Sequence, residues 1–225
     1  MVVPKIHFGL LGGIYLPSRV NGTIDVENGV ADAYVFPKLE IVNTNSVSVS
    51  SFAPSSMVIN CTLADHSGIV LGHSTRSTNV LPEPGSNFTL GMPNISLVAA
   101  SLWSPRSPVL YSVVCSLDLG GGIVDLPPAI HIGIREPEWD HESGFKLNGV
   151  PTKILGACNH QDFAGVGVAI PDVLQKFRVA KLQEMGVNAW RTAHNAPTPA
   201  VLDAADRLGM FHFSFIISIF CFWFV

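Results

Sequence analysis

The chain has few charged residues, few cysteines and no cluster of basic residues. Only 13% of its 225 residues are charged, and the formal net charge is −4. Without a basic patch, we do not expect a nucleic acid as a partner. The four cysteines are spaced neither as a dense disulfide framework nor as a zinc site, so we expect no metal and no cofactor.

Long apolar segments are also missing. The apolar stretch at residues 211–225 falls short of the roughly 20 residues that span a bilayer, so a membrane is not an expected partner. Residues 1–20 contain a glycine-broken apolar run without a clear cleavage site, so they do not indicate a signal peptide.

Two successive strand–helix units are predicted between residues 152 and 209. Strands are expected at residues 152–157 and 187–191. Pro171 is expected at the first position of the first helix. This helix has an apolar face of Leu174, Phe177, Leu182 and Met185, and it ends at Gly186. Thr198 caps the second helix, Pro199 opens it and Gly209 closes it. Alternating strands and helices with short connections indicate a right-handed parallel unit.

Polar residues follow both predicted strands at the point where each strand ends. His160 comes after the first strand beside Asn159 and Asp162, and His194 comes after the second beside Arg191. In parallel α/β folds this edge of the sheet holds the active site. A lone histidine here would be an ordinary loop residue, but two at equivalent places favour a site for a polar ligand.

Three sequence runs in this region resemble the start of the barrel in glycoside hydrolase family 2, the β-galactosidase and β-glucuronidase family. They are GACNHQDFAGVGVAIP, MGVNAWRTAHNAPTP and LDAADRLGM. The resemblance implies that His160 and His194 contact sugar hydroxyls and that Arg191 braces the site, with Asn159 and Asp162 beside them. Ala193 stands where the family usually has serine.

The amino-terminal part has the pattern of an all-β domain. Short β-prone runs recur at residues 39–42, 47–52, 57–63, 68–72, 95–99 and 109–117, separated by Gly, Pro, Ser and Asn. This rhythm indicates an immunoglobulin-like β-sandwich. The run LWSPRSPVLYSV at residues 102–113 resembles a structural signature of the family's sandwich domain, and GGIY near the start resembles the end of its jelly-roll domain.

We therefore predict a multidomain β plus α/β chain. Residues 1–19 are a remnant of a jelly-roll sugar-binding domain, and residues 20–135 are the immunoglobulin-like sandwich. Residues 136–210 are the incomplete first part of a (β/α)8 TIM-barrel catalytic domain. Within this range, an Asn-Gly turn at residues 148–149 predicts a hairpin before the first barrel strand. Residues 211–225 lack a helical or strand period, and we interpret this tail as aberrant, from translated intron or an alternative or mispredicted transcript.

The covalent chemistry of the sandwich leaves two questions open. Cys61 and Cys115 both fall on apolar strand faces, where we expect two buried free thiols; a disulfide would need an oxidising compartment. Four Asn-x-Ser/Thr sequons occur, at Asn21, Asn60, Asn87 and Asn94, and they favour a secretory-pathway or extracellular protein.

The predicted activity follows from the resemblance and from what retaining glycosidases need. Such enzymes use two carboxylates about 5–5.5 Å apart. No glutamate follows a predicted barrel strand, and Asp162 is a single carboxylate, so we predict no catalytic residue here. The chain is expected to be a fragment of a β-glycoside hydrolase that is inactive by itself. Two alternatives are a non-catalytic carbohydrate-binding or interaction module and a membrane-associated fragment held by its tail.

Overall fold

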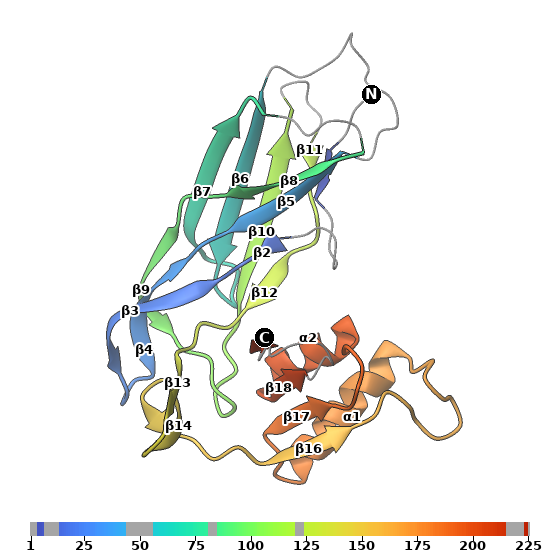
Figure 1. The fold of residues 1–225 in the computed structure, drawn as a ribbon. Helices are drawn as coiled ribbons and strands as arrows, with labels where there is room; N and C mark the ends of the chain where they lie inside the picture. Colours follow the sequence, from blue (N-terminus) through green and yellow to red (C-terminus); the bar gives the residue numbers. More distant parts are fainter. Residues whose placement is uncertain are drawn as a thin grey trace. The chain divides into compact units, whose positions relative to one another are not determined.

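The described part of the chain is mostly β-sheet and contains two helices. The computed structural model describes residues 4–6, 14–43, 56–80, 85–119, 124–214 and 223–224. They fall into two compact units (Figure 1). The antiparallel unit takes residues from 1–101 and 111–134, and the α/β unit takes residues from 102–110 and 135–225.

Three antiparallel sheets build the antiparallel unit. In the first, β5 (Lys38–Asn43) pairs with β1 (Pro4–Ile6), β2 (Ile14–Tyr15) and β8 (Asn87–Gly91). The second has the order β3 (Ser18–Asp25), β4 (Val30–Val35), β9 (Ile95–Ser101). The third has the order β11 (Val124–Asp125), β10 (Tyr111–Asp118), β6 (Met57–Ala64), β7 (Val70–Thr78), and β12 (Ile130–Ile132) also pairs with β10. Thus β1 and β2, from the predicted jelly-roll remnant, hydrogen-bond to β5.

Five of the six predicted strand runs have a counterpart in β5, β6, β7, β9 and β10, and the run at residues 47–52 lies outside the described residues. Side chains alternate between buried and less buried positions along the central strands β6 and β10. Ile59 and Leu63 of β6 and Val113 and Leu117 of β10 are 0% exposed. Their neighbours alternate outward, because successive side chains of a strand point to opposite faces of the sheet.

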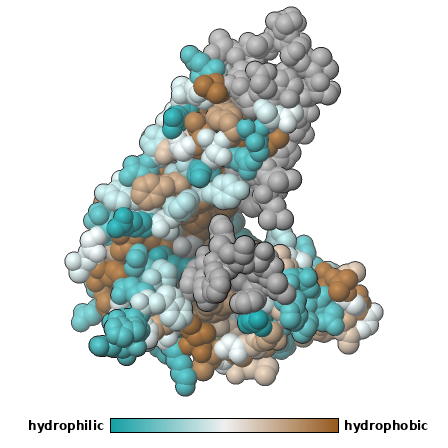
Figure 2. Space-filling model, in the orientation of Figure 1, coloured by the Kyte–Doolittle hydropathy of each residue, from teal (hydrophilic) through white to brown (hydrophobic). Residues whose placement is uncertain are grey.

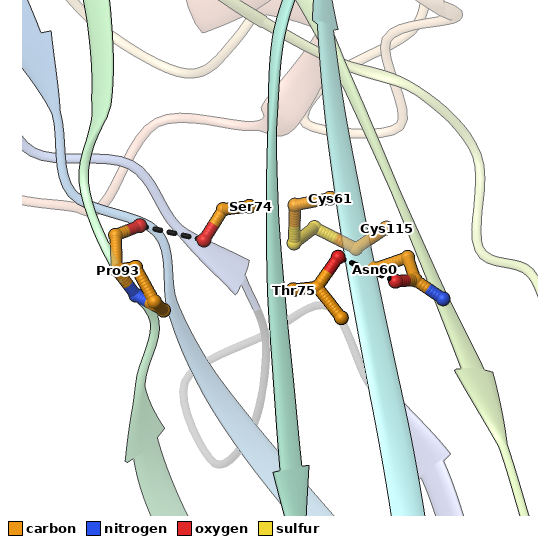
Figure 3. Close-up of a disulfide and its surroundings, with 6 residues drawn as sticks. All are labelled: Asn60, Cys61, Ser74, Thr75, Pro93 and Cys115. Carbon is orange, nitrogen blue, oxygen red and sulfur yellow. Dashed lines mark hydrogen bonds between the residues drawn. A yellow bond between two sulfur atoms is a disulfide. The ribbon is translucent and has the colours of Figure 1, made fainter.

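Cys61 and Cys115 form a disulfide, so the expectation of two free thiols is wrong. The antiparallel register of β6 and β10 places the two residues directly opposite each other, and their sulfur atoms are 2.08 Å apart. Figure 3 shows this bond between the two strands. The two cysteines are 54 residues apart, so only the strand pairing brings them together.

The α/β unit contains two small sheets in addition to its two helices, as far as the structure describes it. Strands β13 (Pro137–Asp140), β14 (Gly144–Leu147) and β15 (Val150–Pro151) form an antiparallel sheet. The predicted Asn-Gly turn is confirmed between β14 and β15, where Asn148 and Gly149 have φ of 53° and 76°. Strands β16 (Gly156–Asn159), β17 (Ala189–Thr192) and β18 (Phe211–Ser214) then run parallel, and β19 (Trp223–Phe224) pairs antiparallel with β18.

Two details of the parallel sheet differ from the prediction. Strand β16 begins four residues later than expected, and β17 begins two residues later. The segment before β16 is held by the Asn188 side chain, because Leu155 N donates to Asn188 Oδ1 at 2.7 Å. The sequence has no strand period over residues 211–225, whereas the structure has strands at Phe211–Ser214 (β18) and Trp223–Phe224 (β19). Phe211 of β18 is 3% exposed and lies in register with Ala189 of β17, so this segment extends the sheet.

The helices α1 (Asp172–Glu184) and α2 (Pro199–Leu208) agree with their predicted limits. The predicted face of α1 is partly wrong. Val179 and Gln175 are buried and Leu182 packs beside Val179, whereas Phe177 and Met185 are 48% and 76% exposed. At α2, Thr198 occupies the N-cap position without a side-chain capping hydrogen bond, and Gly209 adopts the left-handed conformation at the other end.

The segment between β9 and β10 belongs to the α/β unit, although the sequence predicts it within the sandwich. Trp103 is 1% exposed, donates from Nε1 to the Asp206 carbonyl at 2.8 Å, and packs edge-on against Phe211 with ring centroids 5.7 Å apart. Asn148 Nδ2 donates to the Trp103 carbonyl at 3.0 Å. An indole with a satisfied N–H is a stable core element, so this segment anchors the end of α2 and β18.

Candidate functional site

The predicted site residues lie at the carboxyl ends of the first two parallel strands. Asn159 is the last residue of β16, and His160 and Asp162 follow it in the β16–α1 connection. Arg191 lies in β17, and His194 follows that strand by two residues. Parallel register pairs Cys158 with Arg191 and Asn159 with Thr192, so both strands end at the same edge.

His160 and His194 come together at this edge. Their ring centroids are 5.7 Å apart with an interplanar angle of 51°, and both side chains are exposed. His194 has φ of 64°, a left-handed conformation that non-glycine residues adopt at a cost. The backbone places the second imidazole beside the first, and the pair offers nitrogen donors and acceptors to solvent.

Arg191 and Asn159 differ in their exposure and in their hydrogen-bond partners. Arg191 is exposed, and its Nη1 donates to the Cys158 sulfur at 2.9 Å across the two strands. Asn159 is half-buried and its Nδ2 donates to the Ala157 carbonyl at 2.9 Å, while its own carbonyl accepts from Ala193 N at 2.9 Å. Asn159 therefore ties the end of β16 to the residue before His194.

Arg178 is a residue of this edge that the sequence analysis missed. It lies on α1, and its Nη2 donates to the His160 carbonyl at 2.7 Å. Its guanidinium also lies 5.1 Å from the centre of the Trp190 ring, and partial burial lowers its pKa while the Asp162 charge acts in the opposite direction. The arginine thus fixes the backbone at His160. Its place on the helical face beside Val179 is the only sequence signal that could have identified it.

Asp162 begins an exposed loop with apolar members. The carboxylate itself is exposed. Beyond it, Phe163, Val166 and Val168 are 36%, 43% and 79% exposed. Figure 2 shows apolar surface over the connection between β16 and α1. The structure therefore places the histidine pair beside a loop that carries both a carboxylate and apolar side chains.

The exposed imidazoles, guanidinium and carboxylate of this edge are all hydrogen-bonding groups. Among the described ranges, no group of three or more His, Cys, Asp or Glu residues could hold a metal ion. No helix in the described part of the chain is long and apolar enough to cross a membrane.

In sequence, the chain is similar to β-galactosidases and β-glucuronidases. The chain is 37% identical over 108 residues to a β-galactosidase of Bacteroides ovatus, which covers 48% of this chain and 13% of that protein. It is 30% identical over 149 residues to a β-glucuronidase of Formosa agariphila, which covers 65% of this chain and 15% of the relative. No family model matches the chain.

Solved structures agree with the sequence matches. A glycosyl hydrolase family 2 member from Bacteroides cellulosilyticus has a TM-score of 0.75 at 27% identity, over 89% of this chain and 25% of that chain. A β-glycosidase from Bacteroides vulgatus has a TM-score of 0.72 at 28% identity, over 89% of this chain and 23% of that chain.

In fold and in sequence the chain is similar to glycoside hydrolases. Within that class it is related to glycoside hydrolase family 2. The chain spans only about an eighth to a seventh of the length of the curated relatives described above.

Proposed function

We propose that the chain is part of a retaining β-glycoside hydrolase and supplies one side of its sugar-binding site. In this proposal the antiparallel unit is the immunoglobulin-like sandwich, and β16, β17 and β18 with α1 and α2 open a (β/α)8 barrel. The substrate is a β-glycoside of the galactoside or glucuronide class, because the relatives carry those two names.

The single observation that carries the proposal is the position of His160 and His194. They follow consecutive parallel strands and their rings are 5.7 Å apart. Ligands of parallel α/β folds bind beyond the carboxyl ends of the strands, where side chains from several strands converge. Two imidazoles at this separation can each hydrogen-bond a different hydroxyl of one sugar ring.

The other residues would assist in different ways. Arg191 is exposed beside Cys158 and offers a permanent positive charge with several donors. Asp162 offers an acceptor from the neighbouring loop. Arg178 is a positioning residue in this proposal, because it donates to the His160 carbonyl. Asn159 is another, because its side chain donates to the Ala157 carbonyl and its backbone carbonyl accepts from Ala193 N, next to His194.

We further propose that the 225-residue chain does not hydrolyse glycosides by itself. A retaining glycosidase needs an acid/base carboxyl and a nucleophilic carboxylate about 5–5.5 Å apart. Among the described residues that follow the parallel strands, Asp162 offers one carboxylate. A complete enzyme would take the catalytic pair from other strands of the barrel.

A chimaeric enzyme tests the sugar-binding proposal. Residues 153–210 of this chain would replace the aligned segment of the Bacteroides ovatus β-galactosidase, which keeps α1 and α2 packed together. We expect the chimaera to hydrolyse a chromogenic β-galactoside. In it, Arg191→Ala should lower kcat/KM roughly 10- to 100-fold, which corresponds to a lost charge-assisted hydrogen bond of about 1.5–3 kcal/mol.

The matched control is Val173→Ala, because Val173 lies on the same transplanted segment and is 77% exposed. This variant should keep the kinetics of the unmodified chimaera. An active chimaera in which Arg191→Ala and Val173→Ala have the same kcat/KM would refute the role of Arg191. Hydrolysis by the 225-residue chain alone that disappears with Asp162→Asn would refute the second proposal.

A further inference from the structure

The antiparallel unit presents its sequon asparagines at the surface. Asn21, Asn60, Asn87 and Asn94 are all exposed. An N-linked glycan is bulky and requires a surface position, and it forms only on Asn-x-Ser/Thr. Asparagine is a surface residue in most folded proteins, so exposure alone does not distinguish a glycosylated sequon and each site needs a closer look.

At Asn60 the strand geometry suits the modification. In β6, Ile59 and Cys61 are 0% exposed, and Asn60 and Thr62 alternate onto the opposite face. The amide oxygen of Asn60 accepts from Thr75 Oγ1 at 2.8 Å, and Figure 3 shows the amide nitrogen on the side away from Thr75. The atom that would carry the sugar therefore points outward while the oxygen is held by the sheet.

Asn94 has an equivalent arrangement at the start of β9. Ile95 is 2% exposed and packs inward, whereas Asn94 and Ser96 are both exposed. Alternation thus places the asparagine and the hydroxyl residue of this sequon on the solvent side. At the other two sequons the amide nitrogen is engaged: Asn21 Nδ2 donates to Tyr34 and Asn87 Nδ2 donates to Glu40. The inference is therefore confined to Asn60 and Asn94.

The disulfide supplies independent support, because it concerns the compartment in which the chain folds. Cys61 and Cys115 are 0% exposed and bonded to each other. Disulfides form and persist in oxidising compartments, and the endoplasmic reticulum is the compartment in which sequons are glycosylated. Cys61 is also the central residue of the Asn60 sequon, so one tripeptide carries the bonded cysteine and the exposed acceptor.

We propose that the antiparallel unit is a glycosylated, disulfide-bonded module with N-linked glycans at Asn60 and Asn94. The glycans would lie on the outer face of β6 and at the start of β9, which belong to two different sheets of this unit. This proposal does not depend on the sugar-hydrolysis proposal, because it concerns a different unit and a different chemistry.

Peptide mapping of the full chain tests it. The 225-residue chain is directed into the endoplasmic reticulum of a eukaryotic host, and the same measurement is made on the chain captured from its own cells. The chain is digested without reduction, so that a disulfide appears as a linked pair of peptides. Peptide-N-glycosidase in heavy-oxygen water then converts each glycosylated asparagine to a heavy-oxygen aspartate. We expect a Cys61–Cys115 linked peptide and heavy-oxygen aspartate at positions 60 and 94 from both sources.

Matched variants separate the sequon from the fold. Thr62→Ala should abolish the label at Asn60, Thr62→Ser should keep it, and Asn60→Gln should remove it without changing the hydroxyl residue. Ser96→Ala and Ser96→Thr make the same comparison for Asn94. Disulfide-bonded chain from its own cells with unmodified Asn60 and Asn94 would overturn the proposal, and so would reduced, unmodified chain from that source.

Discussion

Replacing Gly209 by alanine tests how the Trp103 segment is fitted against the end of α2. Gly209 has φ of 74°, and a Cβ built on it would lie 2.9 Å from both the carbonyl carbon and the Cα of Pro105, with the Pro105 oxygen closer still. These are backbone atoms, so relief requires the segment itself to move. The left-handed conformation costs alanine about 1–2 kcal/mol, and overpacking adds about 1–3 kcal/mol.

Gly186→Ala is the matched control for this change. Gly186 also follows a helix of the α/β unit with φ of 84°, but a Cβ there would meet nothing within 4 Å. It therefore carries the conformational cost without the collision. The difference in the free energy of unfolding between the two variants should be about 1–3 kcal/mol, with Gly209→Ala the less stable.

Urea unfolding followed by tryptophan fluorescence measures this difference. All four tryptophans lie within the residues of the α/β unit, so their emission reports that unit and not the antiparallel one. Equal unfolding free energies for Gly209→Ala and Gly186→Ala would refute the close packing of Pro105 against α2.

Three further predictions concern covalent and ionisable groups. Reducing the Cys61–Cys115 disulfide should lower the unfolding free energy of the antiparallel unit by about 4 kcal/mol, as chain entropy predicts for a loop of this length. Circular dichroism in urea, with and without reductant, measures this change. An unchanged unfolding midpoint would contradict it. Burial raises the pKa of Asp206 from 3.8 to about 6, so the folded state binds its proton more tightly, and stability from this group falls as pH rises from about 4 to 6. Asp206→Asn should remove that fall. Burial lowers the pKa of His212 from 6.5 to about 4, so its contribution falls as pH drops from about 6.5 to 4, and His212→Asn should remove this opposite trend. Stability profiles against pH that coincide for both variants and the wild type would contradict both assignments.

Local patterns in the sequence predict the elements whose geometry is set by nearby residues. The alternation in β6 and β10 gives the buried faces, Asn148-Gly149 gives the turn, and Pro171 and Gly209 mark helix ends. Each of these signals acts within a few residues, where side-chain direction and allowed φ values decide the outcome.

Long-range pairing explains the errors. The disulfide depends on the register between β6 and β10, and β18 becomes a strand because β17 lies beside it. Trp103 follows β9 of the antiparallel unit in the sequence but satisfies its N–H in the α/β unit. Such partners are distant along the chain, and periodicity contains no information about them.

The site was predictable in part. Strand ends in a parallel sheet predict that His160 and His194 lie at one edge, and the structure brings their rings to 5.7 Å. Arg178 was missed because its contact is to a backbone carbonyl, for which the sequence has no motif. The substrate roles of all five residues remain predictions: Asn159, His160, Asp162, Arg191 and His194.

The most direct test of the sugar-binding proposal is the kcat/KM of the chimaeric β-galactosidase with His194 replaced by alanine. Both histidines are exposed at the same edge, so removing one should cost transition-state contacts without unfolding the segment. We predict a fall of roughly 10- to 100-fold in kcat/KM, with kcat lowered as well. A His194→Ala chimaera with the kinetics and the thermal stability of the Val173→Ala control would show that this edge does not contact the sugar.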